Sequence, residues 1–279
     1  MIPDRAERRA VNAVLYGSVV AVLVFFYTPI ATLVLFSFSE SRFLSFPIES
    51  FSLRWYGELF ANNDFWPALK NSALLATVST VFATALGTGG AIAWIRWRFR
   101  FQRAFQALTF APLLFPQLLL GVVMLLWFSV LGNMYDFSPS LWTAVVGHVV
   151  YITPFALIII AVQVHGFDDT LEDAARDAGA NAVQVFREVT LPLIWPGVFA
   201  AAIFAFLLSW GNFYVTYSLA GTARTLPTFV FSGIAVGSSP VYPALATVTF
   251  VPALVLLGVA DVFRRRAAAR RAAPVAGSE

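Results

Sequence analysis

Residues 141–164, LWTAVVGHVVYITPFALIIIAVQV, decide the fold, because this segment contains no Asp, Glu, Lys or Arg. A helix rises 1.5 Å per residue, and about 20 residues cross a hydrocarbon core of about 30 Å. The segment is therefore long enough and apolar enough to span a membrane. Its backbone must be helical, because lipid offers no hydrogen bonds and the period-two alternation of a barrel strand is missing.

Five further segments have the same apolar character. They are residues 13–38, 71–95, 105–131, 196–217 and 242–263. The chain as a whole is 59% apolar and 12% charged, whereas soluble domains have shares of about 45–50% and 25%. The first segment exceeds the 7–15 residues of a signal-peptide core and lacks a small-residue cleavage site, so we interpret it as a retained span. The sequence predicts an all-α membrane protein with six transmembrane helices.

The distribution of Lys and Arg predicts the orientation of these spans. An even number of spans places both termini on one side, together with the loops at residues 96–104 and 165–195. The opposite side holds only Arg42, Arg54, Lys70 and Arg224, leaving 14 of the 18 basic residues on the side of the termini. Positively charged loops remain in the cytoplasm, so we expect both termini there.

This topology also predicts the domain organisation. A cytoplasmic N-terminus (1–12) precedes a six-span transmembrane domain (13–263), and a basic cytoplasmic tail (264–279) follows it. The tail is interpreted as a topological stop signal, although an arginine cluster beside a membrane can also bind anionic lipid.

Charged residues are almost absent from the predicted spans, where the only one is Asp261 in the sixth. Ion-coupled carriers and proton pumps use buried ionisable groups as relays. The two halves of the chain also show no inverted repeat of broken helices, which would indicate a secondary carrier. An ion-coupled secondary transporter is therefore the alternative interpretation, and a membrane scaffold without transport activity is the third.

Motifs of enzyme chemistry are missing. The chain has no Cys and two His, and it contains no HExxH, GxSxG or GxxxxGK[ST] pattern, so we expect no catalytic site, bound cofactor or metal in this chain. His148 is expected to form hydrogen bonds within the helix bundle, and Gly87, Gly89 and Gly90 to let helices approach closely. Pro112, Pro116 and Pro154 are candidate kink points.

The segment 168–192, DDTLEDAARDAGANAVQVFREVTLP, is too patterned to be a simple connector. Asp169 and Glu172 have capping-box spacing and predict a helix start. A stripe of small apolar residues follows, and Gly179 suits a left-handed helix end. The stripe consists of Leu171, Ala174, Ala175 and Ala178.

A second stripe consists of Ala182, Phe186 and Val189, and it predicts a further helix that ends before Pro192. We therefore expect a bent helix pair on the cytoplasmic surface. Such a pair could lie on the membrane or dock a protein. Its acidity favours a protein partner, because helices that lie on membranes are usually basic.

These residues carry a resemblance to a known family. Glu172, Ala174, Ala175, Gly179, Leu191 and Pro192 resemble the EAA loop of permease subunits in ATP-binding-cassette importers, with Asp173 where many members have the first Ala. The similarity continues in FSFSESRF (36–43), RWYGELFANND (54–64), RWRFR (96–100), SWGNFYVTYSLAG (209–221) and RTLPTFVFSGIAVGSSPVYPALAT (224–247). The chain is similar to the second permease of spermidine/putrescine-type importers.

The resemblance implies a set of partners and a location. The EAA loop would be the coupling helix that contacts a cytoplasmic ATPase dimer, which would hold ATP and Mg²⁺. The residues implied in this contact are Glu172, Ala174, Ala175, Gly179, Ala180, Leu191 and Pro192. A second permease would complete the pathway as a heterodimer, and a periplasmic binding protein would deliver the solute. The expected location is the bacterial inner membrane, and the expected mechanism is alternating access.

One departure from the family concerns the cargo. Polyamine permeases often have an acidic pair where this chain has Gly211 and Asn212. Aromatic faces can also bind a desolvated cation, and four aromatic residues at spacings of three and four predict one such helix face. They are Trp210, Phe213, Tyr214 and Tyr217.

On that helix face Asn212 is predicted to point away from the middle of the aromatic stripe. A polyamine-like cargo is expected, with another small organic solute or a phosphonate as alternatives. Packing of the bundle or an interfacial belt equally explains the aromatic residues.

Overall fold

The computed structural model describes residues 5–237 and 239–250, with side chains from Val11 onward. Over these residues the fold is all-helical, and the only β pairing is an isolated bridge between Ser39 and Phe51. This confirms the all-α part of the prediction. The chain divides into two compact units, one of residues 64–232 and one of the residues that precede and follow them.

The first unit contains helices α1 (Arg5–Ser37) and α2 (Arg54–Ala61) and the short apolar helix Val241–Phe250. The segment after α1 is fixed by Trp55, whose buried indole N–H donates to the carbonyl oxygen of Ser39 at 2.5 Å. Most side chains of α1 are exposed, as expected for a helix that would contact lipid or another subunit.

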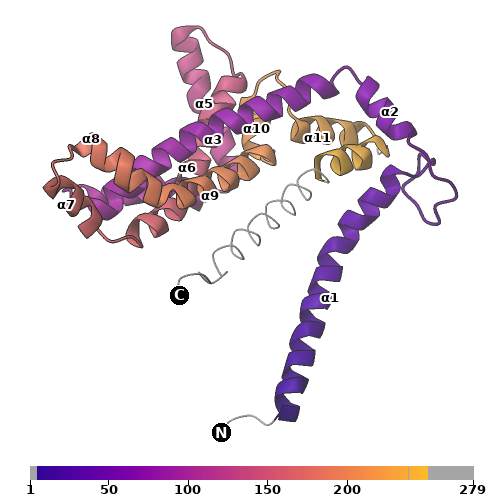
Figure 1. The fold of residues 1–279 in the computed structure, drawn as a ribbon. Coiled ribbons are helices and arrows are strands. Elements are labelled where there is room, and N and C mark those ends of the chain that lie inside the picture. Colours follow the sequence, from indigo (N-terminus) through magenta and orange to yellow (C-terminus); the bar gives the residue numbers. More distant parts are fainter. Residues whose placement is uncertain (1–4, 238, 251–279) are drawn as a thin grey trace. The chain divides into compact units, whose positions relative to one another are not determined.

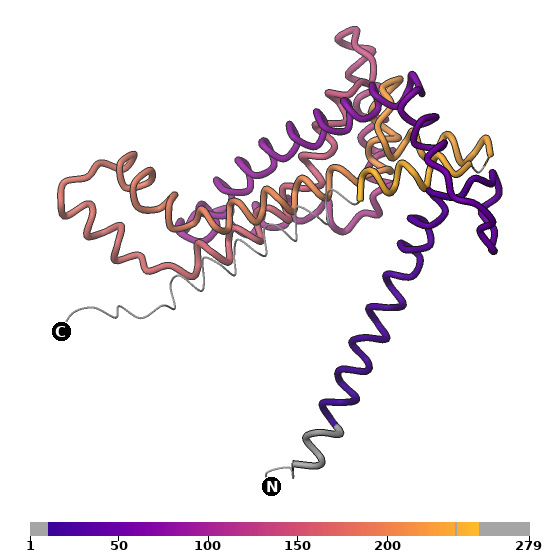
Figure 2. The backbone as a smooth tube through the Cα atoms, turned by 45° about the vertical axis from the view of Figure 1, so that its right-hand side comes forward, coloured from indigo at the N-terminus to yellow at the C-terminus, as the bar shows by residue number. Residues whose placement is uncertain are grey.

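The second unit, residues 64–232, is built on three long helices, α3 (Phe65–Arg96), α6 (Leu141–His165) and α9 (Leu191–Trp210). Figure 1 shows them running side by side, and Figure 2 shows the same arrangement from another side. Their contact surfaces form a core of small and branched apolar side chains from all three helices. It includes Ala91, Ala156, Leu157, Ile160, Ile194 and Ala201.

Two glycines allow α3 and α6 to approach closely. A Cβ atom on Gly87 would lie 2.9 Å from the Cβ of Ala156, and one on Gly90 would lie 2.7 Å from Cδ1 of Leu157. Among the described residues, nothing lies within 4 Å of the Cβ position of Gly89. The predicted close-packing role is therefore confirmed for Gly87 and Gly90 and stays a prediction for Gly89.

The predicted span 105–131 is not one helix. The structure has α4 (Gln102–Phe110), a 3₁₀ turn η1 (Ala111–Leu114) and α5 (Gln117–Tyr135). Phe115 is extended, with φ −94° and ψ 135°, because the ring of Pro116 disfavours a helical conformation at the residue before it. Pro154, by contrast, lies inside the continuous helix α6.

The predicted span 196–217 is also interrupted. Helix α9 ends at Trp210, and a separate short helix α10 (Tyr214–Leu219) follows. After α10 the chain continues to α11 (Leu226–Val236). The local sequence Gly211-Asn212 explains the break, because Asn212 begins α10 as a capping residue.

Within residues 5–237 and 239–250, five helices are long and apolar enough to cross a membrane. They are Val11–Ser37, Phe65–Arg96, Gln117–Tyr135, Leu141–His165 and Ala182–Trp210. The sixth predicted span, 242–263, begins within the helix Val241–Phe250 and then lies outside the described residues, as does the predicted tail 264–279.

Candidate functional site

The two ends of the second unit differ in structure. At one end, α3 and α6 both end and a short helix α7 (Thr170–Asp177) begins; we call it the α7 end. At the other end, α9 stops and α10 begins; we call it the α10 end. The residues singled out in the sequence fall at these two ends.

Helix α7 begins where the sequence predicts, but the predicted capping box does not form. Oδ1 of Asp168 accepts the backbone N–H of Thr170 at 3.0 Å, and this hydrogen bond holds the pKa of Asp168 below its usual value. The carboxylate of Asp169 instead pairs with Arg96, and that of Glu172 bonds to Thr190. Both carboxylates therefore bond to residues that are distant in the sequence, and neither caps the helix.

The end of α7 confirms the predicted left-handed turn. Gly179 has φ +90°, its N–H donates to the carbonyl of Arg176 at 2.9 Å, and the N–H of Ala180 donates to that of Ala175 at 3.0 Å. This pair of bonds is a Schellman motif, which satisfies the last carbonyls of a helix. Asn181 then starts the next helix, and its side chain accepts from the backbone of Val183 and Gln184.

The helix that follows does not end before Pro192, so that prediction is wrong. The segments α8 (Ala182–Gln184), η2 (Val185–Thr190) and α9 form one continuous helix, with η2 in the π conformation. Pro192 lies in the first turn of α9 and has no N–H, and the wider π turn precedes it. Leu191 packs against the core of α3, α6 and α9.

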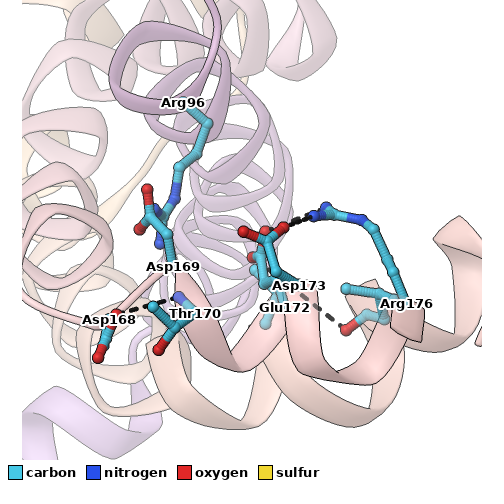
Figure 3. A network of polar contacts seen from close by, with 9 residues as sticks. Arg96, Asp168, Asp169, Thr170, Glu172, Asp173 and Arg176 are labelled. Atoms are coloured by element: carbon cyan, nitrogen blue, oxygen red, sulfur yellow. Dashed lines mark hydrogen bonds and ion pairs between the residues drawn. The ribbon is translucent and has the colours of Figure 1, made fainter. Parts of the chain in front are cut away.

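Polar contacts, rather than apolar packing, hold α7 in place, since no residue of α7 is buried. Figure 3 shows the side chain of Arg96 extending from the end of α3 to Asp169, at the start of α7. The guanidinium carbon of Arg96 also lies 4.1 Å from the ring centroid of Phe167. Farther along α7, the hydroxyl of Thr190 donates to Oε1 of Glu172 at 2.6 Å.

The face of α7 that carries the small residues remains open. Leu171, Ala174 and Ala178 are exposed and Ala175 is half-buried. Beside this face, Arg176 donates to Asp173 at 2.7 Å and lies 3.4 Å from Glu172. The helix therefore presents a narrow apolar stripe beside partly paired charges, which is a surface that a partner's shallow groove can cover.

At the α10 end, the predicted single aromatic face is not present, because the helix breaks between Trp210 and Tyr214. Trp210 stacks on Phe206 within α9. Phe213 instead stacks on Tyr217, with ring centroids 5.2 Å apart, and both rings contact Phe231 of α11.

Tyr214 meets Phe213 edge-on, and both Tyr214 and Tyr217 are exposed. Tyr217 also lines a cavity of about 350 Å³. The cavity wall further includes Thr216, Ala220, Gly221, Thr222, Ala223, Arg224, Thr228 and Ser232. The sequence did not indicate Phe231 as a member of this aromatic cluster.

Asn212 is buried and has a structural role at the break. Its Oδ1 accepts the backbone N–H of Val215 at 3.1 Å, and its carbonyl oxygen accepts the hydroxyl of Thr216 at 2.7 Å. The side chain is therefore buried, unlike the exposed tyrosines, and it caps the first turn of α10.

His148 joins the two sides of this break. One ring nitrogen lies 2.7 Å from Oγ of Ser209 in α9, and the other lies 2.8 Å from Oγ1 of Thr216 in α10. The prediction that His148 forms hydrogen bonds within the bundle is confirmed. The partners were not predicted, because they lie 61 and 68 residues away in the sequence.

Comparison with protein families gives a match over residues 83–271 to the inner membrane component of binding-protein-dependent transport systems. The chain is 30% identical to the "Spermidine/putrescine transport system permease protein PotC" of Escherichia coli (strain K12), covering 89% of this chain and 93% of that protein. It is 33% identical to the "Putrescine transport system permease protein PotI" of the same organism, covering 80% of each chain.

Solved structures show the same fold at low sequence identity. A chain of a bacterial transporter that imports the acidic polysaccharide alginate aligns with a TM-score of 0.70 and 18% identity, covering 94% of this chain and 99% of that one. A chain of the MetNI methionine transporter aligns with a TM-score of 0.58 and 20% identity, covering 77% and 98%. The family match and the fold agree, and the chain belongs to the family of inner membrane components of binding-protein-dependent transport systems.

Proposed function

We propose that this chain is one of two permease subunits of an importer whose energy comes from a separate ATPase, and that its cargo is a polyamine-class cation. The cargo assignment is supported by the names of the two E. coli relatives and by the exposed tyrosines at the α10 end. The second permease completes the pathway, and a periplasmic binding protein delivers the solute.

In this proposal the α7 end faces the cytoplasm of a bacterial cell. Arg96, Arg98, Arg100 and Arg103 all lie at that end, as positively charged cytoplasmic loops do. The chain has no Cys, so single cysteines can be placed without a background. A cysteine at Ala178 should react with an impermeant reagent only from the cytoplasmic side, and one at Asp136 only from the periplasmic side.

The observation that carries the coupling role is that α7 has no buried residue and exposes a small-residue stripe. The ATPase, which binds ATP and Mg²⁺, contacts this stripe. Glu172, Ala174, Ala175, Gly179 and Ala180 shape the contact. Leu191 and Pro192 lie where the following helix enters the bundle.

Movement of α7 reaches the bundle along the chain itself. After the turn at Gly179, one helix continues from Ala182 to Trp210 and ends at the break before α10. Closure of the ATPase dimer displaces α7 and rocks this long helix. The pathway between the two permeases then opens alternately to the periplasm and to the cytoplasm.

The cargo assignment relies on aromatic faces, because this chain has Gly211 and Asn212 where its resemblance to polyamine permeases implies an acidic pair. Cation–π contacts contribute about 0.5–2 kcal/mol. Tyr214 and Tyr217 are exposed, and the partner permease supplies the carboxylate that a polyamine also requires. Phe213 contacts both of these rings, and Trp210 lies at the other side of the break, where it stacks on Phe206.

The coupling role is tested by purifying the chain with its ATPase and measuring ATP-driven uptake in proteoliposomes. Ala175→Trp should abolish uptake by obstructing the contact, whereas Ala104→Trp, on the exposed face of α4, should not. Uptake that persists in Ala175→Trp, or that depends on an ion gradient and not on ATP, contradicts the proposal and supports a secondary transporter.

The cargo is tested with radiolabelled putrescine and spermidine at matched membrane abundance. Trp210→Ala and Tyr214→Ala should each lower uptake by about twofold to thirtyfold, the range that corresponds to one cation–π contact. Asn212→Asp should not raise uptake, because this side chain is buried and bonded to the backbone of Val215. Unchanged uptake in Trp210→Ala and Tyr214→Ala would assign those two residues to packing alone, and a rise in Asn212→Asp would show that this position faces the cargo.

A further inference from the structure

Arg96 is the last residue of α3, and its position is unusual for a charged side chain at the end of a span. Only 13% of its side-chain surface is exposed. A guanidinium removed from water requires partners that replace its hydration. The neighbours of Arg96 therefore indicate what this side chain does.

Both partners of this guanidinium lie at the start of α7. One is the carboxylate of Asp169, and the other is the ring of Phe167. Nε and Nη2 of Arg96 are buried and form no hydrogen bond within the described residues. The stabilisation of this buried charge thus depends on the two residues that lead into α7.

The contact matters because α7 has few other attachments. No residue of α7 is buried, and its second link to the unit is the hydrogen bond from Thr190 to Glu172. Thr190 ends the π turn that continues into α9. The two contacts therefore attach α7 to two different long helices. Asp169 links its start to Arg96 of α3, and Glu172 links it to Thr190, which leads into α9.

We propose that Arg96 is a positioning residue that holds the first turn of α7 against α3, so that a displacement of α7 moves α3 together with α9. This inference rests on the proposed coupling role of α7. A residue that only marked the cytoplasmic side would not need these contacts. Arg98, two residues later, is exposed and forms no ion pair within the described residues, so it is a matched control.

The experiment uses the complete transporter, purified with its ATPase and second permease, and does not require the cargo. Tyr217→Cys places the chain's single cysteine at the α10 end, where the native side chain is exposed. Its rate of labelling by an impermeant maleimide is compared without nucleotide and with ATP plus vanadate. The ratio of the two rates reports how strongly the nucleotide state reaches the far end of the bundle.

Arg96→Gln should reduce this nucleotide response by about fivefold to tenfold, which is the order of effect found for residues that transmit coupling. Arg98→Gln should leave the response unchanged. Arg96→Lys should restore part of it, because an ammonium keeps the charge but not the planar stacking on Phe167. Asp169→Asn removes the ion pair by changing its exposed partner, and it should reduce the nucleotide response as much as Arg96→Gln does.

The double variant Arg96→Gln/Asp169→Asn should respond no worse than Arg96→Gln alone, since both changes remove one contact. The inference is overturned if Arg96→Gln and Asp169→Asn both respond to nucleotide as strongly as Arg98→Gln does while the ATPase is still bound. If Ala175→Trp also retains the response, the proposed function of α7 fails as well. If only Ala175→Trp loses the response, the proposed role of Arg96 is rejected and the proposed function of α7 is retained.

Discussion

The α7 end and the α10 end of residues 64–232 both interrupt a helical path, but they use different chemistry. At the α7 end the contacts are charged, and Asp169 and Arg176 are largely exposed. At the α10 end the contacts join neutral groups, and His148, Ser209 and Thr216 are all buried.

The burial of each end explains the difference. Ion pairs with both partners exposed, such as Arg176 with Asp173, contribute little and are easily exchanged, because water solvates each partner when the pair separates. The pair of Arg96 with Asp169 differs, because only Asp169 is exposed. A buried hydroxyl or imidazole without its partner loses a hydrogen bond that water does not replace. We infer that the α7 end is suited to being displaced by a partner, and the α10 end to keeping a fixed break.

The largest stability effect is expected at the α10 end. His148→Leu leaves Oγ of Ser209 without its partner, whereas Thr216 keeps its bond to the carbonyl of Asn212. The cost should be about 1–3 kcal/mol, seen as a lower melting temperature of the purified transporter. Thr153→Val is the matched control, because that hydroxyl bonds only within its own helix. Equal melting temperatures of the two variants would contradict the idea that buried hydrogen bonds hold the α10 end.

Gly179→Val should have a smaller effect on stability and a large one on transport. A β-branched residue at φ +90° costs about 1–2 kcal/mol, and this strain is confined to the end of α7. We expect uptake to be lost while the melting temperature changes little, because no residue of α7 is buried. Gly179→Asn should retain uptake, since Asn tolerates the left-handed conformation. Normal uptake in the Val variant would contradict the prediction.

Glu172→Gln should have a still smaller effect. The amide oxygen can still accept the hydroxyl of Thr190, while the attraction to the exposed Arg176 is lost. An ion pair with one exposed partner and a distance of 3.4 Å is weak, on the order of 1 kcal/mol, so hydrogen exchange across residues 170–177 should rise only slightly. Glu172→Lys places a positive charge beside Arg176 and should raise exchange further. The same exchange in both variants would show that charge is not what holds this turn.

The smallest effect is a pH dependence at the start of α7. The pKa of Asp168 is lowered because its carboxylate accepts the N–H of Thr170. The stabilisation is therefore complete above the ordinary Asp pKa of about 3.9 and is lost as the pH falls through the lowered value. Hydrogen exchange at Thr170, measured against Asp168→Asn, should increase only in that acidic range. A change near neutral pH would contradict this assignment.

The local pattern of the sequence correctly predicts several elements. The apolar runs give helices that are long enough to cross a membrane, and Gly179 gives the left-handed turn after α7. Both depend on residues close in the sequence, namely the length of an apolar run and the absence of a Cβ atom. The sequence also predicts where α7 begins and that His148 forms hydrogen bonds within the bundle.

The predictions that fail involve a competition between local and distant partners. Asp169 has the spacing of a helix cap, but Arg96, 73 residues earlier, takes its carboxylate. The aromatic stripe assumes one helix through Gly211, but the chain breaks there and Phe213 packs against Phe231 of α11. The helix after Gly179 was expected to end before Pro192, but a π turn carries it onward.

The sequence by itself determined that this protein is helical, that it contains long apolar helices and where the chain turns after α7. These features follow from hydropathy and from backbone sterics, which act over one or two turns of a helix. Only the tertiary structure decided that His148 joins Ser209 to Thr216 and that Arg96 holds Asp169. A polar side chain near a bundle takes the partner that packing brings within hydrogen-bond distance, and spacing along the chain does not specify that partner.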